Sequence, residues 1–178
     1  MRTGSRAAII IIAGVIALSA ALAPSQNEPA HPPAILDQGD FFSPQAIGAA
    51  EHRAAVIKNE TGTDVLVLTF VSIPEAKASE LESKGKDRFF SDWLIELAAR
   101  HKTHGIVILA VDHPRHLEIG VQKSLLEHDF AFRDRDALRD LLVDRFKRRE
   151  FDRGLNDAMY LILDRIGENH RAAGDHRN

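Results

Sequence analysis

The stretches TDVLVLTFV at residues 63–71 and GIVILAV at residues 105–111 are β-branched or apolar almost without interruption. Runs of this kind are typical of strands covered on both faces, as in a parallel sheet. Residues 87–101, which lie between them, have apolar side chains at helical spacing: Phe90, Trp93, Leu94, Leu97 and Ala98. A strand, a helical crossover and a second strand form a βαβ unit, which is nearly always right-handed. The two runs therefore predict an α/β fold.

The flanking sequence predicts one helix before this unit and one strand after it. Ser43 is a candidate N-cap, Pro44 suits the first helical position, and the apolar spacing continues until Gly62. After the second strand, residues 112–115 form a turn into HLEIGV at 116–121, where apolar and polar residues alternate. This pattern predicts an antiparallel hairpin at one side of the sheet.

Two further helices are expected near the C-terminus, starting near Asp134 and Asp152, which are natural N-caps. The stretch 72–86 is polar, is broken by proline and glycine, and is expected to be irregular. With helices on both faces, the elements predict a three-layer α/β/α sandwich with a small mixed sheet. The expected core residues are Val67, Trp93, Leu97, Ile108, Leu141 and Ile162.

The N-terminus has the pattern of an export signal or a membrane anchor. Arg2 and Arg6 precede an uncharged run at residues 7–23, AAIIIIAGVIALSAALA. Seventeen helical residues span roughly 26 Å, slightly less than a hydrocarbon core of about 30 Å, so length leaves cleavage and anchoring both open. We expect a periplasmic or otherwise extracytoplasmic protein, secreted or N-terminally anchored, with residues 7–23 as its membrane contact.

The segments after this run differ in composition. Residues 24–36 contain four prolines and are expected to form an extended linker. Residues 37–166 are expected to form the domain. Residues 167–178 are polar, have no apolar period and are expected to be a disordered tail.

Composition excludes several classes of function. The 178 residues include no cysteine, which rules out disulfide scaffolds, thiolate zinc sites and a cysteine nucleophile. The net charge is -3, with both signs interspersed, so we expect no nucleic-acid partner. The chain has no P-loop, GxGxxG or GxSxG motif, and no motif supplies a base for Ser72.

Polar residues follow both buried strands and precede the first helix. Ligand sites in α/β sheets form beyond the carboxyl ends of parallel strands. The residues expected at that edge are Asp37, Asp40, Ser72, Glu75, Asp112 and His113. Of these, we consider Asp37, Asp40, Asp112 and His113 candidate ligands for Ca²⁺ or Mg²⁺. The alternative is that they are ordinary turn and cap residues.

Six motifs in order support a family resemblance. They are FFSPQ at residues 41–45 after Asp37, ETGTDVLVLTF at 60–70, the F-x-x-W of residues 90–93, HGIVILAVDHPRHLEIG at 104–120, Asp129, and FDRGL at 151–155. In this order they resemble the TPM domain, a family of exported or lumenal α/β/α domains, over roughly residues 35–166.

The resemblance implies two functions. The family is associated with divalent cations and carries a phosphatase label, while other members are similar to assembly or repair factors. Where the family usually has Asp-Asn-Gly, this chain has Thr103, His104 and Gly105; Gln122 and Ser124 stand near its usual second glycine and glutamate. We therefore favour a binding or assembly module for a membrane or envelope protein partner. The alternative is a divalent-metal-dependent acid phosphatase, with its cation held by acidic residues at the sheet edge, Asp37 and Asp112.

Overall fold

The computed structural model describes residues 32–175, which belong to one compact unit. The predicted signal or anchor at residues 1–23 and most of the predicted linker lie outside this range. The elements follow the order β1 (Ile35–Asp37), α1 (Pro44–Thr61), β2 (Asp64–Ser72), η1 (Glu75–Lys77), α2 (Ala78–Lys84), α3 (Lys86–Arg100), β3 (Gly105–His113), β4 (His116–Val121), α4 (Lys123–His128), α5 (Phe132–Lys147) and α6 (Phe151–Asp175). No helix within residues 32–175 is both long and apolar enough to cross a membrane.

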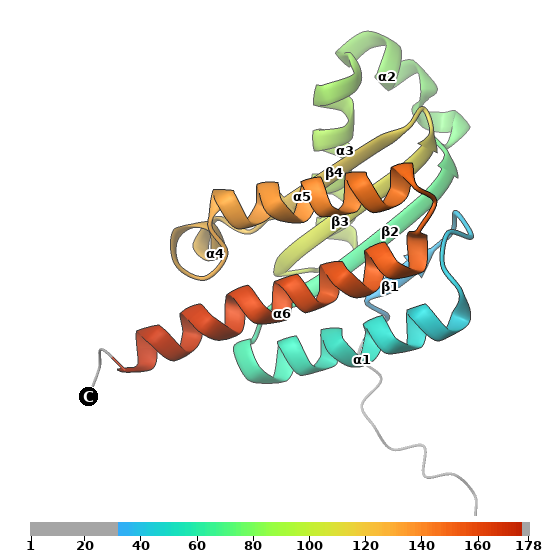
Figure 1. The fold of residues 1–178 in the computed structure, drawn as a ribbon. Helices are drawn as coiled ribbons and strands as arrows, with labels where there is room; N and C mark the ends of the chain where they lie inside the picture. The colour runs from blue at the N-terminus through green and yellow to red at the C-terminus, as the bar shows by residue number, and fades with distance from the viewer. Residues whose placement is uncertain (1–31, 176–178) are drawn as a thin grey trace, which may run out of the picture. The chain divides into compact units, whose positions relative to one another are not determined.

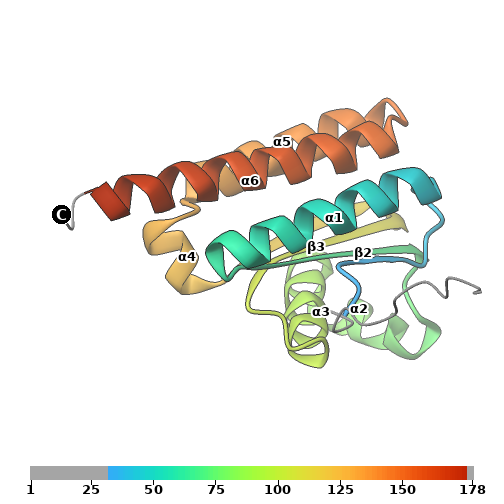
Figure 2. The same cartoon turned by 90° about the horizontal axis from the view of Figure 1, so that it is seen from below.

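The sheet has the order β1-β2-β3-β4, with the first three strands parallel and β4 antiparallel to β3. Helices α1, α5 and α6 cover one face, and α3 covers the other (Figures 1 and 2). The predicted three-layer α/β/α sandwich with a small mixed sheet and a terminal hairpin is confirmed.

Alternating side chains of the strands divide the core into two clusters. One cluster joins the sheet to α1, α5 and α6 and includes Ala50, Ile57, Val67, Ile108, Leu138 and Ile162. The other joins it to α3 and includes Leu66, Leu68, Phe90, Trp93, Leu97 and Leu109. Leu141, predicted as a core residue, is only partly buried at the rim of the first cluster.

The two crossovers have opposite hands. Both join neighbouring parallel strands and step in the same direction across the sheet. Because α1 lies on one face and α3 on the other, one crossover is right-handed and the other left-handed. This places three helices on one face and leaves the other face to α3.

Helix α1 has the predicted boundaries. The Ser43 hydroxyl accepts a hydrogen bond from the Ala46 N–H at 3.2 Å, and Pro44 occupies the first helical position. Gly62 ends the helix in the left-handed conformation, with φ of 74°, which an L side chain rarely adopts.

The sequence did not predict four short elements. Strand β1 begins at Ile35, inside the predicted linker; a three-residue strand is too short to show an alternating pattern. The stretch predicted to be irregular at 72–86 contains η1 and α2, which have no buried residue and hence no apolar stripe. Helix α4 buries only Leu125.

The two C-terminal helices begin earlier than predicted. Asp134 is not the N-cap of α5: it lies inside the first turn, and its carboxylate accepts the Ala131 N–H at 3.0 Å. Asp152 lies within α6 rather than before it. Helix α6 continues to Asp175, which corrects the predicted tail over residues 167–175; the Asn169 side chain donates to the Asp129 carbonyl at 2.8 Å and ties this end to the domain.

Candidate functional site

The loop between β1 and α1 is organised by Asp37. Its Oδ1 accepts the Phe41 N–H at 3.1 Å and the Thr69 hydroxyl, and its Oδ2 accepts the Phe42 N–H at 2.9 Å. The fully buried Thr69 in turn accepts the Gly39 N–H at 3.0 Å. Asp37 therefore does what a turn-forming aspartate does, since it satisfies backbone donors that the loop would leave unpaired.

The same loop is tied to the start of α6. The Ser43 N–H donates to Asp152 Oδ1 at 2.8 Å, although the two residues are 109 positions apart. Residues Phe41 and Phe151 also pack their rings together, with centroids 5.2 Å apart. The N-terminal turns of α1 and α6 are thereby held side by side at one edge of the molecule.

A pocket of about 540 Å³ lies between this loop and the α5–α6 turn. Its lining residues are Asp40, Phe41, Phe42, Ser43, Arg149, Glu150, Phe151, Asp152 and Arg153. Asp40 and Arg149 both have positive φ, 52° and 60°, an uncommon conformation for non-glycine residues. The aromatic rings and the charged side chains of both signs suit a ligand or partner segment that has an apolar part and charged groups.

Asp112 and His113 lie in a different place, at the β3–β4 hairpin. Asp112 Oδ2 is 3.2 Å from His113 Nδ1, and Asp112 Oδ1 is 3.5 Å from Arg115 Nε. The strand register sets Asp37 beside Thr69, which is beside Ala110. Asp112 is thus two strands and two residues away from Asp37, roughly 12 Å between Cα atoms from standard strand spacings.

The predicted ligands do not assemble into one cluster. Asp37 organises its loop, Asp40 lines the pocket, and Asp112 pairs with His113 and Arg115 at the hairpin. Ser72 neighbours His113 in the strand register, and Glu75 is exposed at the start of η1. Among residues 32–175, no three His, Asp or Glu side chains form a group that could hold a metal ion. The described side chains therefore do not fit the expected Ca²⁺ or Mg²⁺ centre, whose existence remains a prediction.

Two residues important for this edge were missed. Thr69 is the only polar residue within the run 65–71, and a lone polar residue in a buried strand needs a hydrogen-bond partner, so the sequence contained a usable signal. Arg149 belongs to no motif that would single it out in the sequence. Its place in the pocket depends on the packing of the α5–α6 turn against the β1–α1 loop, which no local pattern reveals.

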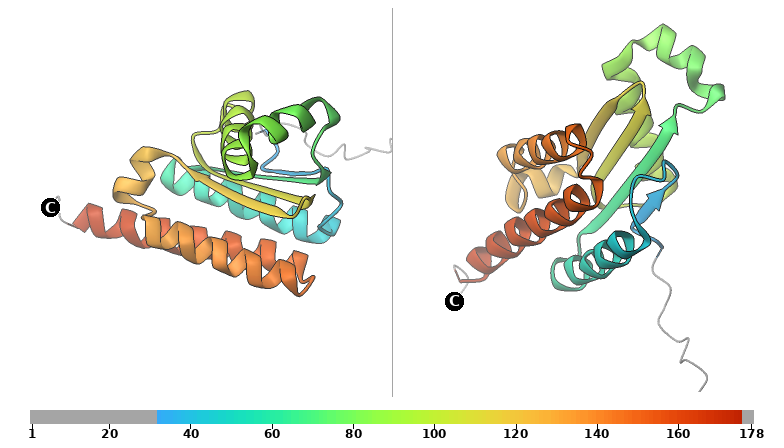
Figure 3. Two further views of the ribbon diagram at one scale, coloured as in Figure 1. Left: turned by 90° about the horizontal axis from the view of Figure 1, so that it is seen from above. Right: turned by 45° about the vertical axis from the view of Figure 1, so that its right-hand side comes forward.

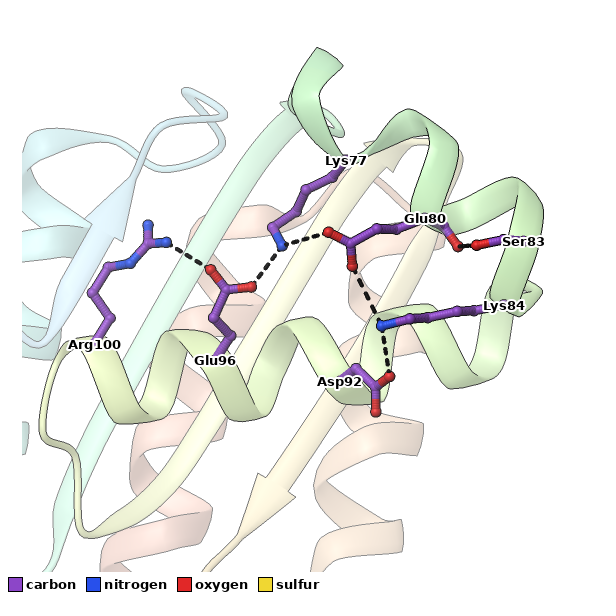
Figure 4. Close-up of polar contacts among 7 residues, drawn as sticks. All are labelled: Lys77, Glu80, Ser83, Lys84, Asp92, Glu96 and Arg100. Carbon is purple, nitrogen blue, oxygen red and sulfur yellow. Dashed lines mark hydrogen bonds and ion pairs between the residues drawn. The ribbon is translucent and has the colours of Figure 1, made fainter.

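A second polar surface joins α2 to α3 (Figure 4). Lys77 Nζ lies 2.6 Å from Glu96 and 3.6 Å from Glu80, and Lys84 Nζ lies 3.0 Å from Asp92. The hydrogen bond from Lys77 lowers the pKa of Glu96, and those to Asp92 and Glu80 raise the pKa of Lys84. The Lys84–Asp92 pair joins α2 to α3 and the Lys77–Glu96 pair joins η1 to α3, while Leu81 of α2 packs against the core cluster beneath α3.

Comparisons with known proteins place this architecture. The TPM domain model matches residues 35–165. The solution structure of the N-terminal domain of a P. gingivalis protein superposes with a TM-score of 0.61 at 14% identity, over 78% of this chain and 85% of that one. The N-terminal domain of a Corynebacterium glutamicum protein gives 0.53 at 10% identity, over 82% and 85%. At these identities the likeness concerns the fold alone. No curated protein matches the chain.

Proposed function

Because the chain belongs to the TPM domain family, we propose that it acts as a binding or assembly module for a membrane or envelope protein partner. The observation that carries the proposal is the use of Asp37. Both of its carboxylate oxygens accept hydrogen bonds from the β1–α1 loop or from Thr69. These three hydrogen bonds use most of the acceptor capacity of the Asp37 carboxylate, which disfavours it as a ligand for a hard cation.

The second acidic residue required by the phosphatase hypothesis is engaged as well. Asp112 faces Arg115 and His113 at a hairpin whose side chains are largely exposed. Metal-assisted phosphoryl transfer needs converging carboxylates and a shaped cavity that excludes water. Asp37 and Asp112, at separate positions in the sheet, do not supply that arrangement.

The pocket at the α5–α6 turn is the surface that we assign to the partner. Arg153 is well exposed, and its distances to Glu150 and Asp157 are long for ion pairs, 3.9 and 3.8 Å. Arg149 is also exposed at the mouth. Export of the chain, expected from residues 7–23, would bring this surface to partners in the membrane or envelope.

The first experiment tests for catalysis. The purified full chain is titrated calorimetrically with Ca²⁺, Mg²⁺ and Zn²⁺, and hydrolysis of a generic phosphomonoester is followed between pH 4 and 8. We expect no metal-dependent turnover. Turnover that is abolished by Asp112→Asn would refute the proposal. This variant is suitable because the Asp112 side chain is partly exposed, whereas a change at Asp37 would disturb the β1–α1 loop.

The second experiment tests the assigned surface. The full chain is used to capture membrane proteins from an envelope fraction, and the pocket variant Arg153→Glu is compared with Arg139→Glu. Arg139 is an exposed residue of α5 that does not line the pocket, so its reversal controls for the change in charge. We expect a specific membrane protein to be lost only with the pocket variant; equal capture by both variants would remove the pocket from the proposal.

A further inference from the structure

Strand β4 forms an open edge of the sheet. The Gln122 N–H donates to the Gly105 carbonyl at 2.9 Å, which identifies residues 105 and 122 as a hydrogen-bonded pair of the antiparallel ladder. By alternation, Leu117, Ile119 and Val121 direct their N–H and C=O groups away from β3. No residue of the described range 32–175 bonds to these outward groups.

The opposite edge of the sheet is shielded. Strand β1 has only three residues, and the Glu51 carboxylate of α1 accepts the N–H groups of Ala34 and Ile35 at 3.0 and 2.8 Å. Short strands and covering side chains are the usual means of blocking an edge. Among residues 32–175, nothing of either kind protects the six-residue β4, so it is the edge that can accept another strand. Figure 3 shows the sheet and its edges from two sides.

The sequence of β4 is self-complementary in one antiparallel register. With Ile119 opposite its own copy, Leu117 lies opposite Val121, and Glu118 lies opposite Gly120. The three pairs made by Leu117, Ile119 and Val121, whose backbone groups point away from β3, are then all apolar. No charged side chain lies opposite one of like charge. Pairing centred on Glu118 would place that carboxylate opposite its own copy. Pairing centred on Gly120 would leave only two apolar pairs.

Helix α3 adds an apolar residue beside this edge. Trp93 packs against Phe70 of β2, with centroids 4.9 Å apart, while Leu94 lies over Gly120, whose added Cβ would be 2.4 Å from a Leu94 methyl. Ile95 follows Leu94 and is turned by a further ~100° about the axis of α3. It therefore lies on the side of the helix nearer β4 and points away from the sheet. Ile95 is 63% exposed, an unusual position for a large aliphatic side chain.

We propose that a second copy of this chain adds to the β4 edge through antiparallel pairing centred on Ile119, which joins two four-stranded sheets into one. The two-fold axis is perpendicular to the sheet, so the two α3 helices lie on the same face and bring their Ile95 side chains toward the axis. The inference goes beyond the binding function proposed above and uses a surface distinct from the pocket.

The absence of cysteine makes a direct test available, because single cysteines can be introduced into the full chain without background. Residues opposite each other in a hydrogen-bonded pair have Cα atoms about 5.5 Å apart, within disulfide range. In the proposed register, Ile119→Cys is opposite itself. Val121→Cys is displaced from its own copy by about 13 Å along the strand and serves as the matched control.

After mild oxidation, we expect roughly tenfold more disulfide-linked dimer for Ile119→Cys than for Val121→Cys, since the control pair exceeds bridging distance. The double variant Leu117→Cys/Val121→Cys should cross-link again. In sedimentation experiments, the unmodified chain should form a dimer that Ile95→Glu weakens, with circular dichroism confirming that the variant is folded. A chain that stays monomeric, or equal cross-linking of the two single variants, would overturn the proposal and would leave the partner-capture result unaffected.

Discussion

Among the described glycines, Gly105, the first residue of β3, is the one where an added methyl group should destabilise the fold most. A Cβ there would lie 1.9 Å from the carbonyl oxygen of Asp64 and 2.7 Å from its backbone nitrogen. Both contacts are with the backbone of the neighbouring strand, so no side-chain rotation relieves them. The alanine variant can form only if the start of β3 moves away from β2.

The expected loss of stability follows from two contributions. Overpacking a close-packed site costs about 1–3 kcal/mol, and a rigid backbone neighbour places this case at the upper end. Displacement of the strand also weakens the bond from the Asp64 N–H to the His104 carbonyl, 3.1 Å long, worth about 1 kcal/mol. We therefore expect Gly105→Ala to lower the free energy of unfolding by about 3–4 kcal/mol.

Gly48 provides the matched control, since an added Cβ on this exposed position of α1 meets nothing within 4 Å. Gly48→Ala should instead stabilise the protein by about 0.5–1 kcal/mol through helix propensity. Urea unfolding followed by the fluorescence of Trp93, the only tryptophan, measures both variants. A loss below about 1 kcal/mol for Gly105→Ala would contradict the strand packing described here.

Three other changes test the packing and the ion pairs. Trp93→Ala should cost about 3–5 kcal/mol, as measured by circular dichroism in urea, because it empties the cluster beneath α3; a loss below about 1 kcal/mol would place the helix elsewhere. Lys77→Met should reduce the pH dependence of stability, because Lys77 lowers the pKa of Glu96 below its ordinary 4.5. The ion pair stabilises the fold at neutral pH by less than about 1 kcal/mol at this exposed site. This stabilisation is lost as the pH falls below about 4.5 and Glu96 becomes protonated. An unchanged pH profile would mean that the pair is not formed. Glu51→Ala should cost about 1–3 kcal/mol and speed amide exchange at Ile35, since it removes the acceptor of two backbone donors; unaltered exchange would argue against this contact.

Local signals account for the elements that could be predicted. The cap at Ser43, the stop at Gly62 and the uninterrupted apolar runs each depend on residues close in sequence. The burial of Trp93 and Leu97 follows from their helical spacing for the same reason. Such features leave a pattern in neighbouring residues, which is why one sequence suffices to predict them.

The features that were missed depend on partners far along the chain. Strand β1 is stabilised by pairing with β2 and by Glu51, and neither leaves a pattern in three residues. Asp152 is of a residue type that favours N-caps, yet it lies within α6, and its carboxylate accepts the N–H of Ser43, the N-cap of α1. The placement of α1 and α3 on opposite faces also departs from the right-handed rule for one crossover, and no residue pattern announces it.

The aspartates of this chain show why carboxylates at strand ends are, by themselves, a poor predictor of a metal site. A loop that leaves the end of a parallel strand exposes backbone donors, and a nearby carboxylate can either accept them or bind a cation, but its lone pairs are limited. In this chain Asp37 and Asp152 each accept a backbone N–H from the segment that opens α1. The buried hydroxyl of Thr69, which donates to Asp37, is therefore the better indicator of that aspartate's role. Where a buried strand carries one polar residue opposite an aspartate, the pair should first be considered as a loop anchor.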